Sequence, residues 1–202
     1  MKNSLAISAI CMAAMMAACG SKQHSDESQE AMADSMAIEN VVEEETVSPD
    51  YVMLNLKERV KSYVIQGFCW RILGSKVEFN EAGLVVKIDG ENPNLERNDK
   101  GQIVKYSYKE ADDSGDMLDC SKEYEYDESG RLTKITTCSY CGDWESEFDR
   151  DDDGNIVTWK NISAVEGTIP FKYKYSGFDE QGNWTKLSEG SEVSTRTLTY
   201  WE

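Results

Sequence analysis

Three aspartates with the spacing of a calcium-binding loop are the first candidates for chemistry in this sequence of 202 residues. Asp149, Asp151 and Asp153 stand at positions 1, 3 and 5 of a segment with glycine at position 6 and isoleucine at position 8. This spacing of oxygen ligands is typical of the first part of a calcium loop. Position 12, where a bidentate glutamate is expected, is Lys160. The segment therefore predicts either a calcium site, the one candidate cofactor, or an acidic turn without metal.

Four cysteines form the second group of chemically capable residues. An even number of cysteines in an exported chain favours disulfides. The register expected for the hairpin around residues 127–130 places Cys120 directly opposite Cys138, which predicts a bridge between them; Cys69 and Cys141 either pair or both stay reduced. The alternative is a redox-active pair of Cys138 and Cys141. That chemistry normally needs a helix N-terminus to lower the thiol pKa, and the segment carries no helical signal, so structural bridging is favoured.

Cys19 is a candidate for lipidation. Residues 1–18 combine Lys2 with an apolar run and small residues before the cysteine, which is typical of a secretory signal and too short for a membrane span. Met-Ala-Ala-Cys at 16–19 resembles the lipobox of bacterial lipoproteins. The resemblance implies cleavage before Cys19, a lipid on its sulfur and a membrane anchor; Gly20 resembles the pattern of lipoproteins sent to the outer membrane. The alternative is an ordinary cleaved signal, with Cys19 a plain thiol.

Charge and histidine content exclude several classes of function. The formal net charge is −17, and removal of residues 1–18, which contain one lysine, makes it −18. Binding to a phosphate backbone needs clustered basic residues, so no nucleic-acid partner is expected. The one histidine is His24, so residues 51–202 contain no histidine for nucleophile activation, zinc binding or proton transfer.

Composition divides the chain into three parts. After the signal at 1–18, residues 19–50 carry nine acidic residues against one lysine and no aromatic residue. Low hydrophobicity with charge of one sign is typical of a flexible tether. All phenylalanine, tryptophan and tyrosine residues lie between Tyr51 and Trp201, so a single globular domain is predicted for 51–202.

Five acidic turns punctuate this domain and position its other residues. Each turn has Asn or Asp, two free positions and glycine, with an apolar residue two places on, at 80–83, 98–101, 127–130, 151–154 and 179–182. Between them lie runs rich in β-branched and aromatic residues, typical of strands. The expected strands are 60–65, 76–79, 84–88, 103–108, 122–126, 132–137, 144–148, 156–162, 169–178, 184–187 and 195–201.

The turn chemistry predicts a register. In a three-residue hairpin loop, Asp or Asn begins a type I turn and glycine takes the left-handed conformation. Beside the turn at 127–130, Tyr126 should face Leu132, and farther along Tyr124 should face Lys134. The same rule in the other copies predicts four more pairs beside the turns, namely Phe79 with Val85, Arg97 with Ile103, Arg150 with Ile156, and Phe178 with Trp184.

Residues 124–133, Tyr-Glu-Tyr-Asp-Glu-Ser-Gly-Arg-Leu-Thr, resemble the YD repeat of RHS-type proteins, and 178–185 are similar. The resemblance implies successive β-hairpins of a long curved sheet, and it implies no activity. Large RHS proteins enclose a toxin in a shell, for which five copies are too few. Small bacterial lipoproteins with degenerate repeats of this kind are the closer likeness.

We therefore expect an all-β domain, an antiparallel meander of repeated β-hairpins with about ten or eleven strands in a twisted, partly curled sheet. The expected function is a non-enzymatic binding or envelope-structural lipoprotein at the periplasmic or surface face of the outer membrane, meeting an envelope protein or glycan. The alternative is a carboxylate-based hydrolase of extracellular polymers. The aromatic residues are expected either as core or as a binding platform.

Overall fold

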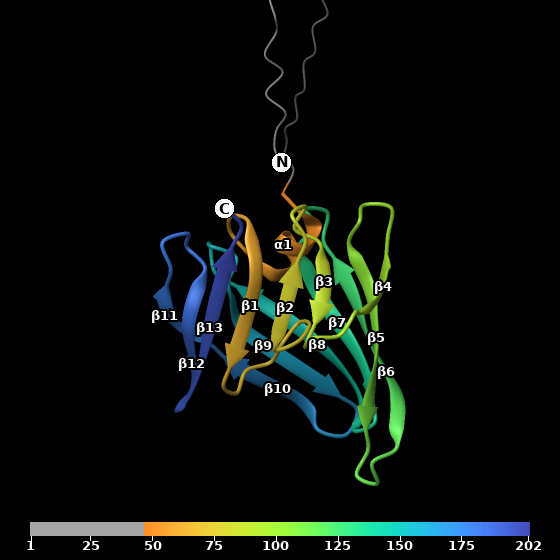
Figure 1. The fold of residues 1–202 in the computed structure, drawn as a ribbon. Helices are drawn as coiled ribbons and strands as arrows, with labels where there is room; N and C mark the ends of the chain where they lie inside the picture. The colour runs from red at the N-terminus through yellow and green to blue at the C-terminus, as the bar shows by residue number, and fades with distance from the viewer. Residues whose placement is uncertain (1–46) are drawn as a thin grey trace, which may run out of the picture. The chain divides into compact units, whose positions relative to one another are not determined.

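Thirteen strands and one short helix make up residues 47–202, the part of the chain that the computed structural model describes (Figure 1). In chain order they are α1 (Pro49–Leu54), β1 (Val60–Gln66), β2 (Lys76–Phe79), β3 (Val85–Ile88), β4 (Asn94–Arg97), β5 (Ile103–Ala111), β6 (Met117–Tyr126), β7 (Leu132–Ser139), β8 (Gly142–Arg150), β9 (Ile156–Ser163), β10 (Gly167–Lys172), β11 (Lys174–Phe178), β12 (Trp184–Glu189) and β13 (Glu192–Tyr200).

The strands form two antiparallel sheets that pack face to face (Figure 1). The first sheet has the order β11-β12-β13-β1-β2-β3 and the second the order β10-β9-β8-β7-β6-β5-β4, so the predicted all-β meander is confirmed. The last strand, β13, pairs back onto β1. The meander is divided between the two sheets at two points. One is Tyr173, inside the run 169–178 that was expected as one strand, and the other follows β3, where Asp89 and Gly90 adopt left-handed conformations.

All five predicted pairs beside the repeated turns are present. In each turn the glycine N–H donates to the carbonyl of the first Asn or Asp, whose own N–H donates to the residue after the glycine. At the turn of 127–130, for example, Asp127 Oδ1 also accepts from Arg131 N at 2.9 Å. The side chain thus fixes the loop, as the acidic consensus predicts.

One step beyond each of these pairs the register shifts by one residue. The second strand of each hairpin carries an extra residue directly after the apolar one, as Thr133 follows Leu132. Such a bulge increases the local twist. The shift corrects the rest of the predicted register, because Tyr124 faces Ile135 instead of Lys134.

Helix α1 begins at sequence signals that favour a helix start. Ser48 is the N-cap, its hydroxyl accepts from Asp50 N, and Pro49 occupies the first turn. Ser48 and Asp50 are buried in the domain. The ordered domain therefore begins before Tyr51, since two polar residues assigned to the tether serve as cap and buried ion-pair partner.

The segment 48–57 makes hydrogen bonds, in chain order, to two of the five repeated turns and to residues directly beside two others. Ser48 Oγ donates to Gly83 O at 2.8 Å, and the Asp50 carboxylate binds Arg97 before the second turn. Asn55 Nδ2 donates to Asp153 O at 3.3 Å, and Lys57 N donates to Asn183 Oδ1 at 2.9 Å. The third turn lies against Val52. One end of the domain is thus closed by a plug, the segment 48–57, seated in the ring of repeated turns.

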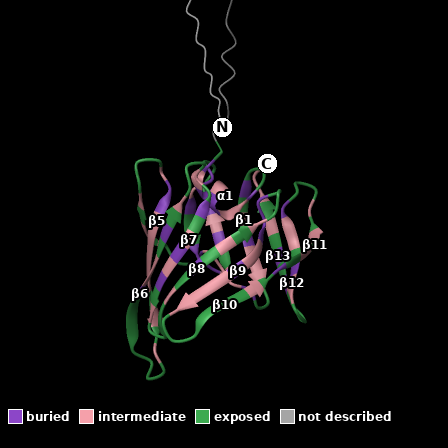
Figure 2. Ribbon diagram, turned by 180° about the vertical axis from the view of Figure 1, so that it is seen from behind, coloured by how far each residue is buried: buried purple, intermediate pink, exposed green. Residues whose placement is uncertain are grey.

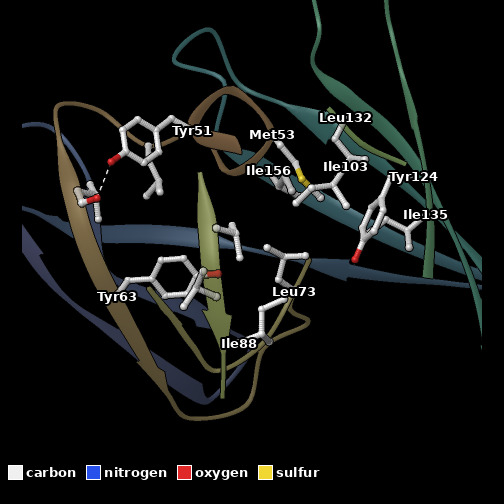
Figure 3. Close-up of a cluster of buried hydrophobic side chains, with 14 of the residues drawn as sticks. Tyr51, Met53, Tyr63, Leu73, Ile88, Ile103, Tyr124, Leu132, Ile135 and Ile156 are labelled. Atoms are coloured by element: carbon white, nitrogen blue, oxygen red, sulfur yellow. Dashed lines mark hydrogen bonds between the residues drawn. The ribbon is translucent and has the colours of Figure 1, made fainter. Parts of the chain in front are cut away.

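The core fills the space between the sheets beneath this plug. Figure 3 shows Met53 of α1 among side chains that come from both sheets. The Tyr51 hydroxyl donates to the carbonyl of Val60, which ties the helix to β1. Figure 2 shows that exposed residues dominate β10 and the far tip of the β5–β6 hairpin. Within residues 47–202, no helix is long and apolar enough to cross a membrane.

Candidate functional site

The acidic segment that suggested calcium is a turn whose carboxylates act separately. Asp149 pairs with Lys160 at 2.9 Å across β8 and β9. Asp151 Oδ1 accepts from Asn155 N at 2.8 Å, and Asp153 contributes its main-chain carbonyl to Asn55. No group of three or more acidic, histidine or cysteine side chains in the described part of the chain is arranged to hold a metal ion. The structure does not bring the three aspartates together.

The predicted opposition of Cys120 and Cys138 is wrong. Cys138 faces Ser121, because the bulge after Leu132 moves the register of β6 and β7 by one residue. A shift of one residue turns side chains to opposite faces, and Cys120 is buried whereas Cys138 is exposed. Cys120, Cys138, Cys69 and Cys141 are all free thiols in residues 47–202. The candidate lipidation residue, Cys19, lies outside the described residues.

Most tryptophan and tyrosine side chains are at least partly buried, whereas Phe68 and Phe178 are exposed. Among the tryptophans and tyrosines, Tyr140 alone is classed as exposed, at 40%. This confirms the expectation of an aromatic core and corrects that of an exposed platform. Trp70 lies within 6.2 Å of both Trp144 and Trp159, measured between ring centroids, and 5.5 Å from Phe171.

A pocket of about 70 Å³ lies between the two sheets next to these rings. One water needs about 10–15 Å³ in such a measure, so the pocket has room for several waters or a small organic molecule. Most of its wall comes from the loop between β1 and β2, from β1, β11, β12 and β13 of the first sheet, and from β8 and β9 of the second. The C-terminal end of α1 and two residues between strands, Asn155 and Tyr173, complete it. The lining residues are Leu54, Asn55, Tyr63, Ile65, Cys69, Trp70, Arg71, Ile72, Arg150, Asn155, Ile156, Trp159, Tyr173, Tyr175, Trp184, Leu187 and Arg196.

Arg196 on β13 is the most unusual member of this wall. Only 5% of the residue is exposed. Its Nε donates to the Trp184 carbonyl at 2.9 Å, and the guanidinium lies 4.1 Å from the centroid of the Trp184 ring. Its Nη2 is buried and has no hydrogen-bond partner. Burial lowers the pKa of Arg196 to about 10, because a charged group loses its hydration there.

Two further buried donors in the wall also lack partners, Trp70 Nε1 and Arg71 Nε. Both residues belong to the loop 67–75, which folds inward between the sheets. Lys122 holds this loop in place, since its ammonium donates to the carbonyls of Arg71, Ile72 and Leu73 at 3.0, 3.3 and 3.4 Å. Burial lowers the pKa of Lys122 to about 8.

The pocket lining contains three arginines and no acidic residue. Arg150 donates to the carbonyls of Gly154 and Leu132 at 2.8 and 3.2 Å, so main-chain oxygens satisfy it. The charge of Asp179 raises the pKa of Arg196, but this carboxylate accepts its hydrogen bond from the Tyr200 hydroxyl. The lining of this pocket is therefore electropositive, although the domain as a whole is strongly acidic.

One feature of the sequence indicates the unusual position of Arg196. Residues of β13 alternate between faces, and Ser194, Arg196 and Leu198 share the inner face. An arginine in register with inward-facing residues of a strand is unusual, because buried charges are rare without a partner. The pocket itself depends on the inward fold of loop 67–75, which no local pattern indicates.

A scan against protein-family models finds no match, and no curated protein matches the sequence.

Proposed function

We propose that this chain is an exported, lipid-anchored binding protein of the cell envelope, without catalytic activity, whose β domain holds a small molecule in the pocket between its sheets. The observation that carries the proposal is the buried Nη2 of Arg196, which has no partner in an aromatic-lined pocket. Buried polar groups are nearly always hydrogen-bonded. A hydrogen-bond donor without a partner beside apolar walls is an arrangement that small-molecule sites use to orient a ligand.

The composition of the pocket argues against the alternative, a carboxylate-based hydrolase. Glycoside hydrolysis uses two carboxyl groups that flank the scissile bond, and the lining contains neither Asp nor Glu. Residues 51–202 also contain no histidine to act as a base. The thiol of Cys69, the one cysteine in the wall, has a raised pKa because of its burial, which disfavours the thiolate that a nucleophile requires.

The anchor part of the proposal rests on Cys19 and the preceding signal. A lipid on Cys19 would retain the protein on the membrane, on our proposal the outer membrane, while the acidic residues after it separate the domain from the surface. Fractionation of producing cells tests this. We expect the native chain in the membrane fraction with an intact mass that includes the lipid, and Cys19→Ser in the soluble fraction. Unlipidated native chain would contradict the anchor.

Native mass spectrometry of protein purified from its own envelope tests the binding function. We expect a small molecule to accompany the domain. Ile65 lines the pocket and is partly buried, so Ile65→Phe should fill the space and abolish the adduct. The matched control is Val193→Phe, because Val193 is exposed and lies outside the pocket. Native chain without any adduct, or Ile65→Phe that retains it, would contradict the function.

A further inference from the structure

Three observations identify the chemistry of the ligand, and the inference rests on the proposed binding function. The first is electrostatic. Arg196 is a buried cation. Its Nε donates a hydrogen bond to a main-chain carbonyl, and its Nη2 is buried without a hydrogen-bond partner. None of the salt bridges among the described residues includes Arg196. A buried charge without a counter-charge is unfavourable, so an anion that reaches this nitrogen is stabilised more than a neutral molecule of the same shape.

The second observation is the kind of hydrogen-bonding group that the wall offers. The unpartnered buried atoms of the lining are Trp70 Nε1, Arg71 Nε and Arg196 Nη2. All three are donors, because indole and guanidinium nitrogens cannot accept. A ligand suited to them presents acceptors. An ammonium ion finds no unpartnered acceptor on these residues and meets three positive arginines.

The third observation is the size and polarity of the space. The volume of about 70 Å³ is about half that of the dry cavity of ~150 Å³ that takes up benzene. The rings of Trp159, Tyr175 and Trp184 contribute apolar surface beside the donors. A short apolar body therefore fits together with one small anionic group. A planar carboxylate with two oxygens suits a guanidinium edge and an indole donor.

We infer that the pocket binds a short-chain monocarboxylate, with the carboxylate on Arg196 Nη2 and the hydrocarbon part against the aromatic wall.

A titration monitored by ¹H–¹⁵N NMR tests this inference. The protein is the chain without residues 1–18, carrying Cys19→Ser so that no lipid is attached. The probes are butyrate, its neutral isostere butyramide, and butylammonium. Trp70 Nε1–H and the Nε–H of Arg71 and Arg196 give their own signals, so the site of binding is visible. We expect butyrate to shift these signals, with butyramide at least tenfold weaker and butylammonium inactive.

Matched variants assign the effect to Arg196. Arg196→Met should weaken butyrate at least tenfold, and Arg131→Gln, at an exposed arginine of a repeated turn, should leave the affinity unchanged. Should Arg196→Met fail to fold, Trp70→Phe removes one donor with little change of shape and should weaken butyrate severalfold.

The possible outcomes separate this inference from the proposed function. Butyramide that binds as tightly as butyrate would overturn the carboxylate while the pocket remains a binding site. Chloride or inorganic phosphate that binds as tightly as butyrate would show that a bare anion suffices, which overturns the hydrocarbon part. If none of the probes binds, the inference fails, and the proposed function then stands only if an adduct accompanies the native protein.

Discussion

Two arginines of this domain have opposite surroundings: Arg196 is buried, and Arg97 is partly buried, with 25% of its side chain exposed. Arg97, beneath the plug, meets the Asp50 carboxylate at 2.8 Å through both of its terminal nitrogens, and Asp50 is completely buried. Arg196, in the pocket, meets a carbonyl and an aromatic ring and keeps one nitrogen open. The same residue type thus has its charge paired beneath the plug and lacks a hydrogen-bond partner in the pocket. The difference separates a group that holds the fold from one available to a ligand.

The largest loss of stability is expected when the Asp50 carboxylate beneath the plug is removed. Asp50→Ala leaves Arg97 without its counter-charge and Val85 N without the acceptor at 2.7 Å. Breaking a buried pair on one side costs about 3–5 kcal/mol. Urea unfolding should show a loss of that size. Asp152→Ala, at an exposed turn position, is the control and should change stability by less than ~0.5 kcal/mol. A small loss for Asp50→Ala would remove the contrast.

A pair of glycines tests how firmly the plug seats on the turns. Gly83 and Gly115 both occupy turns with left-handed conformations, φ +75° and +87°. A Cβ on Gly83 would lie 2.7 Å from Ser48 Cβ and 2.9 Å from the Tyr51 ring, whereas one on Gly115 would meet open space. Gly115→Ala should cost about 1–2 kcal/mol from the backbone alone. Gly83→Ala should cost about 1–3 kcal/mol more because of crowding. Equal losses of unfolding free energy in urea would show that the plug moves to make room for the added methyl group.

Lys122 lies between these two cases, because it is a partly buried cation whose ammonium donates to three main-chain carbonyls. Its pKa is lowered to about 8 in the folded domain, whereas an unfolded lysine keeps its proton to about pH 10.4. Between these values the unfolded chain binds more protons, so the contribution of Lys122 to stability rises with pH. The stability of the native chain relative to Lys122→Met should grow by about 2 kcal/mol from pH 7.5 to 9.5. A constant difference in urea unfolding would contradict the lowered pKa.

The smallest effect is expected at Arg196 itself. Without ligand, Arg196→Met removes an unpartnered charge and supplies an apolar side chain, so stability should change by less than about 1 kcal/mol or increase. Arg97→Met should cost several times as much, because it leaves the buried Asp50 carboxylate without a counter-charge. Thermal unfolding of the two variants side by side gives the comparison directly. Equal losses would mean that Arg196 also holds the fold.

Local turn chemistry was enough to predict much of this fold. The Asn or Asp and the glycine of each turn fix the loop, and the pairs beside the turns follow, as with Tyr126 and Leu132. The bulge one step later was not predictable from the turn, because it depends on the twist needed to bring neighbouring hairpins around a common core. That single residue separates the predicted position of Cys138 from the real one.

Helix α1 and the pocket show two different reasons for missed features. The signal for the helix was present in Ser48, Pro49 and Asp50, but these residues follow an acidic, featureless stretch and were assigned to it. The pocket has no such signal. It is made when residues far apart, such as Trp70, Trp159 and Arg196, meet between two sheets, and the division into two sheets was itself not predicted. Only the inward position of Arg196 on its strand could be predicted from the sequence.

The pairing of β13 with β1 has a consequence for how the chain matures. Strand β1 has β2 on one side and needs the last nine-residue strand, Glu192–Tyr200, on the other. Contacts between such distant parts of a chain form slowly, because a long loop must close first. An emerging chain therefore cannot form the pairing of β1 with β13 until residues 192–200 have been made. Under the export that we propose, and with transport of an unfolded chain, the sheet would be completed only after transport.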